Sequence, residues 1–288
     1  MRFLDEDGVP VTVYRPNERQ GSLLSGIRQA CDDVYHSRHV IARLFWRDFI
    51  VQFRQKIFGY LWALLGPLLG ILSFLFLFFI GVLNPGEGEM PYTLYVLVGS
   101  TIWGTLPGAM GVVSGGLQAQ ADLIMRTRIP KLALAISSLA GLFYGIVVSM
   151  VTMTIIFFAY GATPTYWFLV YPILVLPMVL LGASLGLVLS VIGTIARDLT
   201  AMASQALSLF MYITPVIYLR SSIGNPTIRK LIDWNPITYL VDVPRSLIYA
   251  GRTENLDIFI WVSASILVVI VLSLRVFYLL EDLVAERL

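Results

Sequence analysis

Residues 132–196 read LALAISSLAGLFYGIVVSMVTMTIIFFAYGATPTYWFLVYPILVLPMVLLGASLGLVLSVIGTIA and contain no charged residue. An α-helix needs about 20 apolar residues to cross the ~30 Å hydrocarbon core of a membrane. The stretch is too long for one such helix, and Gly161-Ala162-Thr163-Pro164-Thr165 in its middle has the composition of a turn. It therefore predicts two membrane-spanning helices joined by a short connection.

Other uncharged stretches predict further spans on both sides of this region. In chain order they are 59–82, closed by the turn Asn84-Pro85-Gly86, a span from Tyr92 to just before Asp122, Thr200–Leu219, and a last span from Ile258 to about Leu280. The fold class is therefore an all-α integral membrane protein with six transmembrane helices, which occupy residues 57–288. Five glycine pairs are spaced four apart, Gly182 and Gly186 among them, and predict close packing between helices of the chain.

The composition agrees with a membrane protein and excludes several other classes. Of the 288 residues, 57% are hydrophobic and 13% charged, with a mean hydropathy of +0.79, whereas soluble chains carry about 25% charged residues. The net charge of +2 offers no broad basic face for nucleic acid. Cys31, His36 and His39 are the only cysteine and histidines, so an internal disulfide is excluded and no metal site is expected.

The distribution of basic residues predicts the orientation of the chain. Lysine and arginine gather in short loops on the cytoplasmic side of membrane proteins. The first 56 residues hold nine of them, whereas the first two loops on the opposite side hold none. Both termini are therefore expected in the cytoplasm. The segment 220–257 opposes the rule with five basic residues, but long structured loops follow it weakly.

Two segments outside the spans have patterns of their own. Residues 1–37 are expected to be a cytoplasmic segment, and 38–56 an amphipathic helix in the membrane interface, or alternatively a cytoplasmic helix packed against the spans. In 220–257, Asn225-Pro226 and Asn235-Pro236 each start a helix and Gly251 ends the second. These predict two short re-entrant outer helices within about 226–250, or alternatively a surface loop. Pro244 is expected to break or kink the second helix.

The chain lacks the residues that several transport and catalytic mechanisms need. The centres of the predicted spans contain no acidic residue and no lysine, which disfavours a proton-coupled transporter. The lysines are Lys56, Lys131 and Lys230, and none follows a glycine as in a phosphate-binding loop. ATP-driven work would therefore require a separate subunit. Asp48, Asp122, Asp198 and Asp242 have basic neighbours, so we expect ion pairs rather than catalysis.

Aromatic residues near the predicted span ends have two interpretations. An interfacial belt of tyrosine and tryptophan accounts for most of them. Alternatively, some stack on sugars along a conduit, and the candidates are Trp62, Trp103, Tyr212 and Tyr218.

A series of short motifs runs along residues 40–250. Its members are Arg47-Asp48, Arg54-Gln55, Gly59-Tyr60-Leu61-Trp62, Pro67-Leu68, Leu123-Ile124-Met125-Arg126, Ile129-Pro130-Lys131, Arg197-Asp198-Leu199, Thr214-Pro215-Val216-Ile217-Tyr218 and Asn235-Pro236-Ile237-Thr238-Tyr239, followed by Asp242 and Arg245. In order and spacing the series resembles the membrane subunits of type-2 ABC exporters of polysaccharide, the group that serves O-antigen, capsule and teichoic acid export.

The resemblance implies a permease that moves a lipid-linked polysaccharide across a bacterial inner membrane. It implies a homodimer with two ATP-binding cassette subunits, which supply ATP and Mg, and no ATPase site or cofactor in this chain. It places ATPase coupling at Arg47, Asp48, Arg54, Asp122, Arg126, Arg128 and Lys131, and an outer gate at Trp234, Asn235, Pro236, Asp242 and Arg245. The alternatives are a permease for drugs or small lipids, and a membrane anchor without transport.

Overall fold

The computed structural model describes the backbone of residues 3–4, 10–11, 23–54, 59–83, 88–120 and 129–287. It describes side chains over 31–51, 65–83, 88–120 and 129–280, apart from 194, 195 and 197. The predicted turn at 84–86 and the coupling residues Asp122, Arg126 and Arg128 lie outside the described residues. So do the side chains of Arg54 and Trp62.

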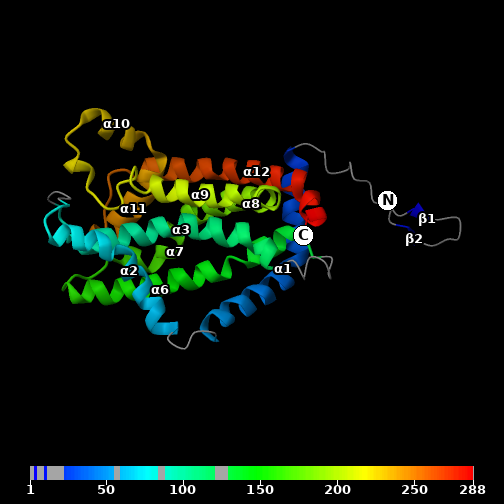
Figure 1. The fold of residues 1–288 in the computed structure, drawn as a ribbon, viewed down its shortest axis with the longest axis horizontal. Coiled ribbons are helices and arrows are strands. Elements are labelled where there is room, and N and C mark those ends of the chain that lie inside the picture. The colour runs from blue at the N-terminus through cyan, green and yellow to red at the C-terminus, as the bar shows by residue number, and fades with distance from the viewer. Residues whose placement is uncertain are drawn as a thin grey trace.

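The described chain is almost entirely helical (Figure 1). One small antiparallel hairpin joins β1 (Phe3–Leu4) and β2 (Pro10–Val11). The long helices are α1 (Leu23–Arg54), α2 (Gly59–Phe79), α3 (Tyr92–Ala119), α6 (Ala140–Ala159), α8 (Leu176–Ile195), α9 (Arg197–Phe210), α11 (Pro236–Ala250) and α12 (Leu256–Arg287). The short ones are α5 (Lys131–Ser137), η1 (Tyr166–Val170), α7 (Tyr171–Leu174), η2 (Arg220–Ser222) and α10 (Pro226–Trp234).

Within the described residues, four helical segments are long and apolar enough to cross a membrane. They are Tyr92–Ala119, Lys131–Ala159, Tyr166–Gly193 and Leu256–Leu280, at the places of the second, third, fourth and sixth predicted spans. The first predicted span corresponds to α2, whose shorter apolar part is Leu65–Phe79. The chain is therefore a multi-pass membrane protein.

The fifth predicted span differs in its bounds. The helix expected over Thr200–Leu219 begins at Arg197 and ends at Phe210, and turns follow it. Its 14 residues rise about 21 Å, which is less than the thickness of the hydrocarbon core. Pro215 explains the early end, because its ring disfavours the helical conformation of Thr214 and it has no N–H to continue the helix.

The N-terminal helix also differs from the prediction. It begins at Leu23, upstream of the expected start at 38, because no proline interrupts residues 17–54. The ring centres of Phe45 and Phe143 lie 5.7 Å apart, so one face of α1 packs against α6. Trp46 and Ile50 are exposed on α1. The helix therefore has a packed apolar side and further apolar side chains that remain uncovered.

The core of the bundle is the contact between α3 and α8. A Cβ atom added at Gly182 would lie 2.3 Å from the carbonyl oxygen of Leu106, and one added at Gly186 would lie 2.8 Å from that of Met110. Two glycines spaced four apart thus let the two backbones approach closely. Figure 1 shows α3, α6, α8, α9 and α12 along the long axis, with the start of α1 and the end of α12 at one end and α10 and α11 at the other.

Candidate functional site

Two capped helices lie at the end of the bundle that is remote from the start of α1. The side chain of Asn225 accepts hydrogen bonds from the backbone N–H groups of Thr227 and Ile228, at 2.9 and 3.4 Å, and begins α10. Asn235 accepts one from Ile237 at 3.1 Å and begins α11. Gly251 ends α11 with a φ of 71°. Asparagine caps before proline and a left-handed glycine after the helix thus set these bounds.

Pro244 was expected to break or kink the second of these helices, and the structure shows no break. Helix α11 continues through Pro244 to Ala250. A proline inside a helix costs about 3 kcal/mol because it removes one hydrogen bond and crowds the preceding turn. Val243, Pro244, Leu247 and Ile248 are all buried, so tertiary packing offsets that cost.

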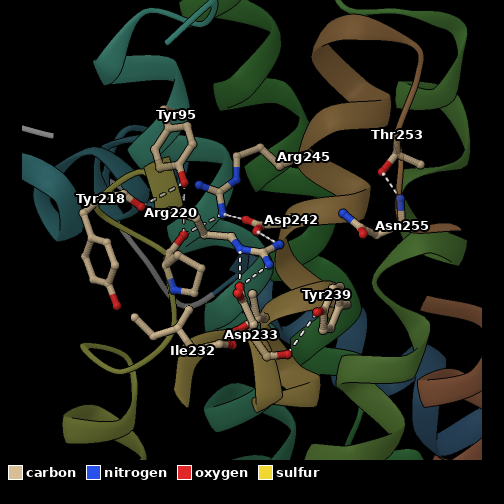
Figure 2. A network of polar contacts seen from close by, with 12 residues as sticks. Tyr95, Tyr218, Arg220, Ile232, Asp233, Tyr239, Asp242, Arg245, Thr253 and Asn255 are labelled. Atoms are coloured by element: carbon tan, nitrogen blue, oxygen red, sulfur yellow. Dashed lines mark hydrogen bonds and ion pairs between the residues drawn. The ribbon is translucent and has the colours of Figure 1, made fainter. Parts of the chain in front are cut away.

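A chain of ion pairs connects the two helices to the segment between α9 and α10 (Figure 2). Arg245 Nη2 lies 2.7 Å from Asp242 Oδ1, and the same nitrogen donates to the carbonyl oxygen of Pro215 at 2.8 Å. Asp242 Oδ2 lies 3.6 Å from Arg220 Nη1, and Arg220 Nε donates to Asp233 Oδ1 at 3.1 Å. These two arginines and two aspartates therefore link η2, which carries Arg220, to α10 and α11.

Two tyrosine rings lie against these guanidinium groups. The guanidinium carbon of Arg245 is 3.8 Å from the ring centre of Tyr95 on α3, and that of Arg220 is 5.4 Å from the ring of Tyr239. The Tyr95 hydroxyl reaches the carbonyl oxygens of Pro215 and Tyr218, at 3.2 and 3.0 Å. The network thus anchors α10 and α11 to α3, the central helix of the bundle.

Burial makes this network sensitive to the loss of any member. The side chain of Arg245 is only 3% exposed, and its Nε and Nη1 atoms have no hydrogen-bond partner in the described part of the chain. Burial raises the pKa of Asp242, and the charges of Arg245 and Arg220 oppose that shift. For Arg220, burial lowers the pKa, but the hydrogen bond with Asp233 and the nearby carboxylates raise it overall.

A polar cavity of about 570 Å³ adjoins the network. Its walls include Glu89, Arg220, Asp242, Arg245, Thr253 and Asn255, several of which Figure 2 draws. The walls carry both signs of charge and many hydrogen-bonding groups. The cavity therefore suits a hydroxyl-rich molecule better than an apolar one.

The predicted gate residues do not all join the network. Asp242 and Arg245 form its centre, and the side chain of Asn235 donates to Thr214 Oγ1 at 3.1 Å beside it. Pro236 is the first residue of α11. Trp234, the last residue of α10, is 88% exposed, although its neighbour Asp233 is paired with Arg220.

Four residues of this site were not predicted from the sequence: Tyr95, Arg220, Asp233 and Tyr239. The sequence held one indication of Arg220. It is one of five basic residues in a segment predicted to lie outside, whereas lysine and arginine usually gather in cytoplasmic loops. In the structure Arg220 and Arg245 are paired with Asp233 and Asp242.

Of the four aromatic residues predicted to line a sugar conduit, two line the same cavity. A second cavity, of about 750 Å³, lies among α2, α3, α6 and α9, and Trp103 and Tyr212 both line it. Ser100, Ser149 and Ser208 add hydroxyl groups to its wall. Trp103 is 4% exposed, so it belongs to the core rather than to an interfacial belt. Tyr218 is linked to Tyr212, because its hydroxyl donates to the Tyr212 carbonyl oxygen at 3.0 Å.

The described coupling residues lie on α1 and α5, away from the ion-pair network. Arg47 Nη2 and Asp48 Oδ1 on α1 are 2.8 Å apart, so these neighbours pair with each other. Lys131 is the first residue of α5, which packs against α1. The helices that carry Arg47 and Lys131 therefore adjoin.

The fold and the site define a class: a helical multi-pass membrane protein whose capped helices close one end of the bundle. Residues 39–249 match the ABC-2 type transporter family, and the chain belongs to it. Two of its curated relatives are named O-antigen export system permease protein RfbA. The relative from Myxococcus xanthus is 26% identical over 226 residues, which are 78% of this chain and 86% of the relative. One from Klebsiella pneumoniae is 24% identical over 246 residues, 84% of this chain and 92% of the relative.

Proposed function

We propose that the chain is the permease subunit of an ATP-driven exporter that moves a lipid-linked, O-antigen-like polysaccharide across the bacterial inner membrane. The observation that carries this proposal is the match over most of both chains to permeases named for O-antigen export. The cavity beside Trp103 and Tyr212 has serine and threonine hydroxyls and aromatic rings on a mostly apolar wall. Sugars bind through hydroxyl hydrogen bonds and contacts with aromatic rings, so these groups are compatible with the proposal. A drug or small-lipid exporter would use a closed apolar pocket.

The complete transporter is a homodimer of this chain with two ATPase subunits, which bind ATP and Mg. In this assembly the chain has six spans, α2 and the segment around α9 being the first and fifth, and both termini are cytoplasmic. Ser204, Gln205 and Ser208 are exposed on α9. Polar groups are unfavourable against lipid, which supports a second copy or a water-filled path at this face.

The two ends of the bundle have different roles in this proposal. Helices α10 and α11 form the outer gate, and the buried network around Asp242 and Arg245 holds it against α3. Helix α1, with Arg47 and Asp48, and the loop that ends at Lys131 transmit the force of ATP hydrolysis. The start of α1 and the end of α12 lie at one end of the long axis and α10 and α11 at the other, which supports the division (Figure 1).

Deletion of the gene for this chain in its host tests the proposal. Surface polysaccharide and polymer retained inside the cell are measured in the deletion strain and in the same strain with the gene restored. Loss from the surface with accumulation inside is expected, since synthesis continues while export stops. Normal surface polymer with altered sensitivity to small toxic compounds would favour the drug-exporter alternative.

A further inference from the structure

An apolar groove of about 610 Å³ lies where α1, α5, α8 and α12 meet. Its walls are aliphatic side chains from all four helices, among them Val34, Leu132, Ile136, Leu180, Leu187 and Leu274. This groove is separate from the outer network and from the cavity beside Trp103, with which it shares no lining residue. Water in such a groove is unfavourable, because its walls offer almost no hydrogen-bonding groups.

The groove lies at membrane depth, toward the end of the bundle where α1 starts. Leu180 and Leu187 both line it from α8, inside the apolar segment Tyr166–Gly193. Seven residues of helix rise about 10 Å, so the groove follows α8 for at least that distance. This length accommodates part of an acyl chain. In the proposed orientation, it belongs to the cytoplasmic leaflet.

One face of α1 forms the mouth of the groove. Cys31, Tyr35 and Arg38 line it and are exposed, and the guanidinium carbon of Arg38 is 4.6 Å from the ring centre of Tyr35. Arg38 is the charged residue among the groove's lining side chains. Asp33, a nearby acidic residue of α1, accepts a hydrogen bond from the Tyr278 hydroxyl at 2.9 Å and does not line the groove.

We propose that this groove binds one anionic phospholipid of the inner leaflet, with an acyl chain between the four helices and the headgroup phosphate on Arg38. Two observations identify the occupant: the walls are apolar at membrane depth, and among the described side chains that line the groove Arg38 is the cation, exposed at the polar edge. Arginine binds phosphate oxygens through paired N–H donors, and a long cationic side chain at a membrane edge extends its head toward the interface. The lipid fills the space between α1 and the spans. The site is independent of the exported substrate.

The sole cysteine of the chain makes the proposal testable, because Cys31 is exposed and lines the groove. The full chain is purified in detergent, its lipids are removed, and the rate of maleimide modification of Cys31 is measured. Phosphatidylglycerol and phosphatidylcholine with the same acyl chains are then added in separate titrations. Half-protection is expected at about a tenfold lower concentration of phosphatidylglycerol, since a hydrogen bond to a charged group contributes about 1.5 kcal/mol.

Matched variants separate headgroup recognition from general detergent effects. Arg38→Gln is expected to abolish the difference in protecting concentration between the two lipids, and Arg38→Lys is expected to retain most of it. Arg43 is an exposed arginine of α1 outside the groove, so Arg43→Gln is expected to leave the difference unchanged. Ala183→Phe, which fills the groove, is expected to prevent protection by either lipid. Val268→Phe, on the exposed face of α12, is its control.

Native mass spectrometry of the same samples counts the bound lipids, and it shows whether each variant is folded. One retained phosphatidylglycerol, lost in Arg38→Gln, is expected. Equal protection by both lipids in the unmodified chain would overturn the proposal. So would protection of Cys31 by the partner ATPase in the absence of lipid, because a protein would then cover the groove.

Discussion

The guanidinium of Arg245 lies 3.8 Å from the ring centre of Tyr95, and the same arginine is ion-paired with Asp242 at 2.7 Å. Arg245 belongs to α11 and Tyr95 to α3, so this contact joins an outer helix to the central helix of the bundle. The Tyr95 hydroxyl also reaches the carbonyl of Pro215, to which Arg245 donates. A displacement of α11 away from α3 must therefore break several interactions together.

Replacing Arg245 is expected to destabilise the protein. Arg245→Ala leaves Asp242 with the more distant Arg220 as a basic partner. The expected loss is therefore below the roughly 3–5 kcal/mol that a fully buried and uncompensated charge costs. Thermal unfolding of the purified chain in detergent measures the effect. Arg252→Ala removes an exposed pair with Glu89 at 3.7 Å and is expected to change the unfolding temperature little. Equal effects of the two substitutions would contradict a special role for the buried network.

Replacing Arg220 is expected to lower the local stability of α10 without unfolding the bundle. Arg220→Gln removes the charge that holds Asp233 on α10 and approaches Asp242 on α11. Hydrogen exchange followed by mass spectrometry is expected to show faster exchange over 226–234 and unchanged exchange over α3. Arg229→Gln, an exposed change on the same helix, is the control. Unchanged exchange of α10 in Arg220→Gln would show that the ion pairs do not hold it.

Any side chain at Gly182 is expected to destabilise the protein, because α3 and α8 are in close contact there. In Gly182→Ala the added methyl would meet the Leu106 carbonyl oxygen at 2.3 Å, so the helices must separate. A loss of about 1–3 kcal/mol is expected from such overpacking. Gly111→Ala is the matched control, because within the described residues its added Cβ meets no atom within 4 Å beyond its own helical turn. A stable Gly182→Ala protein would show that α3 and α8 can adjust without cost.

Replacing Arg47 is expected to impair coupling more than folding. Its ion pair with Asp48 is between adjacent, partly exposed residues of α1, so it contributes little to stability. In the purified complex with the ATPase, Arg47→Ala is expected to retain assembly and thermal stability but to lose export per ATP hydrolysed. Arg229→Ala, an exposed change on α10 that lines none of the cavities described above, is the control. Unchanged export from an assembled Arg47→Ala complex would refute the coupling role.

Local patterns in the sequence were sufficient for much of this fold. Uncharged stretches of about 20 residues mark the apolar helices, since the hydrocarbon core sets their length. Asparagine before proline at 225 and 235 marks the starts of α10 and α11, because the cap and the missing N–H act within one turn.

Local sequence patterns could not predict contacts between distant parts of the chain. Tyr95 and Pro215 are 120 positions apart, and no spacing rule connects them. The persistence of α11 through Pro244 depends on its burial, which outweighs the local preference. The groove beside Arg38 needs four helices in place, so periodicity within α1 could not reveal it.

Transport by the reconstituted complex tests the central claim most directly. Inverted vesicles containing this chain and its ATPase partner receive labelled lipid-linked polysaccharide in the outer leaflet, and an enzyme that degrades the polymer is added afterwards. Polymer that becomes protected only when ATP is hydrolysed, and not with Arg47→Ala, is the predicted result. Polymer that stays fully accessible, while the complex hydrolyses ATP and moves a small lipid or drug, would contradict the account.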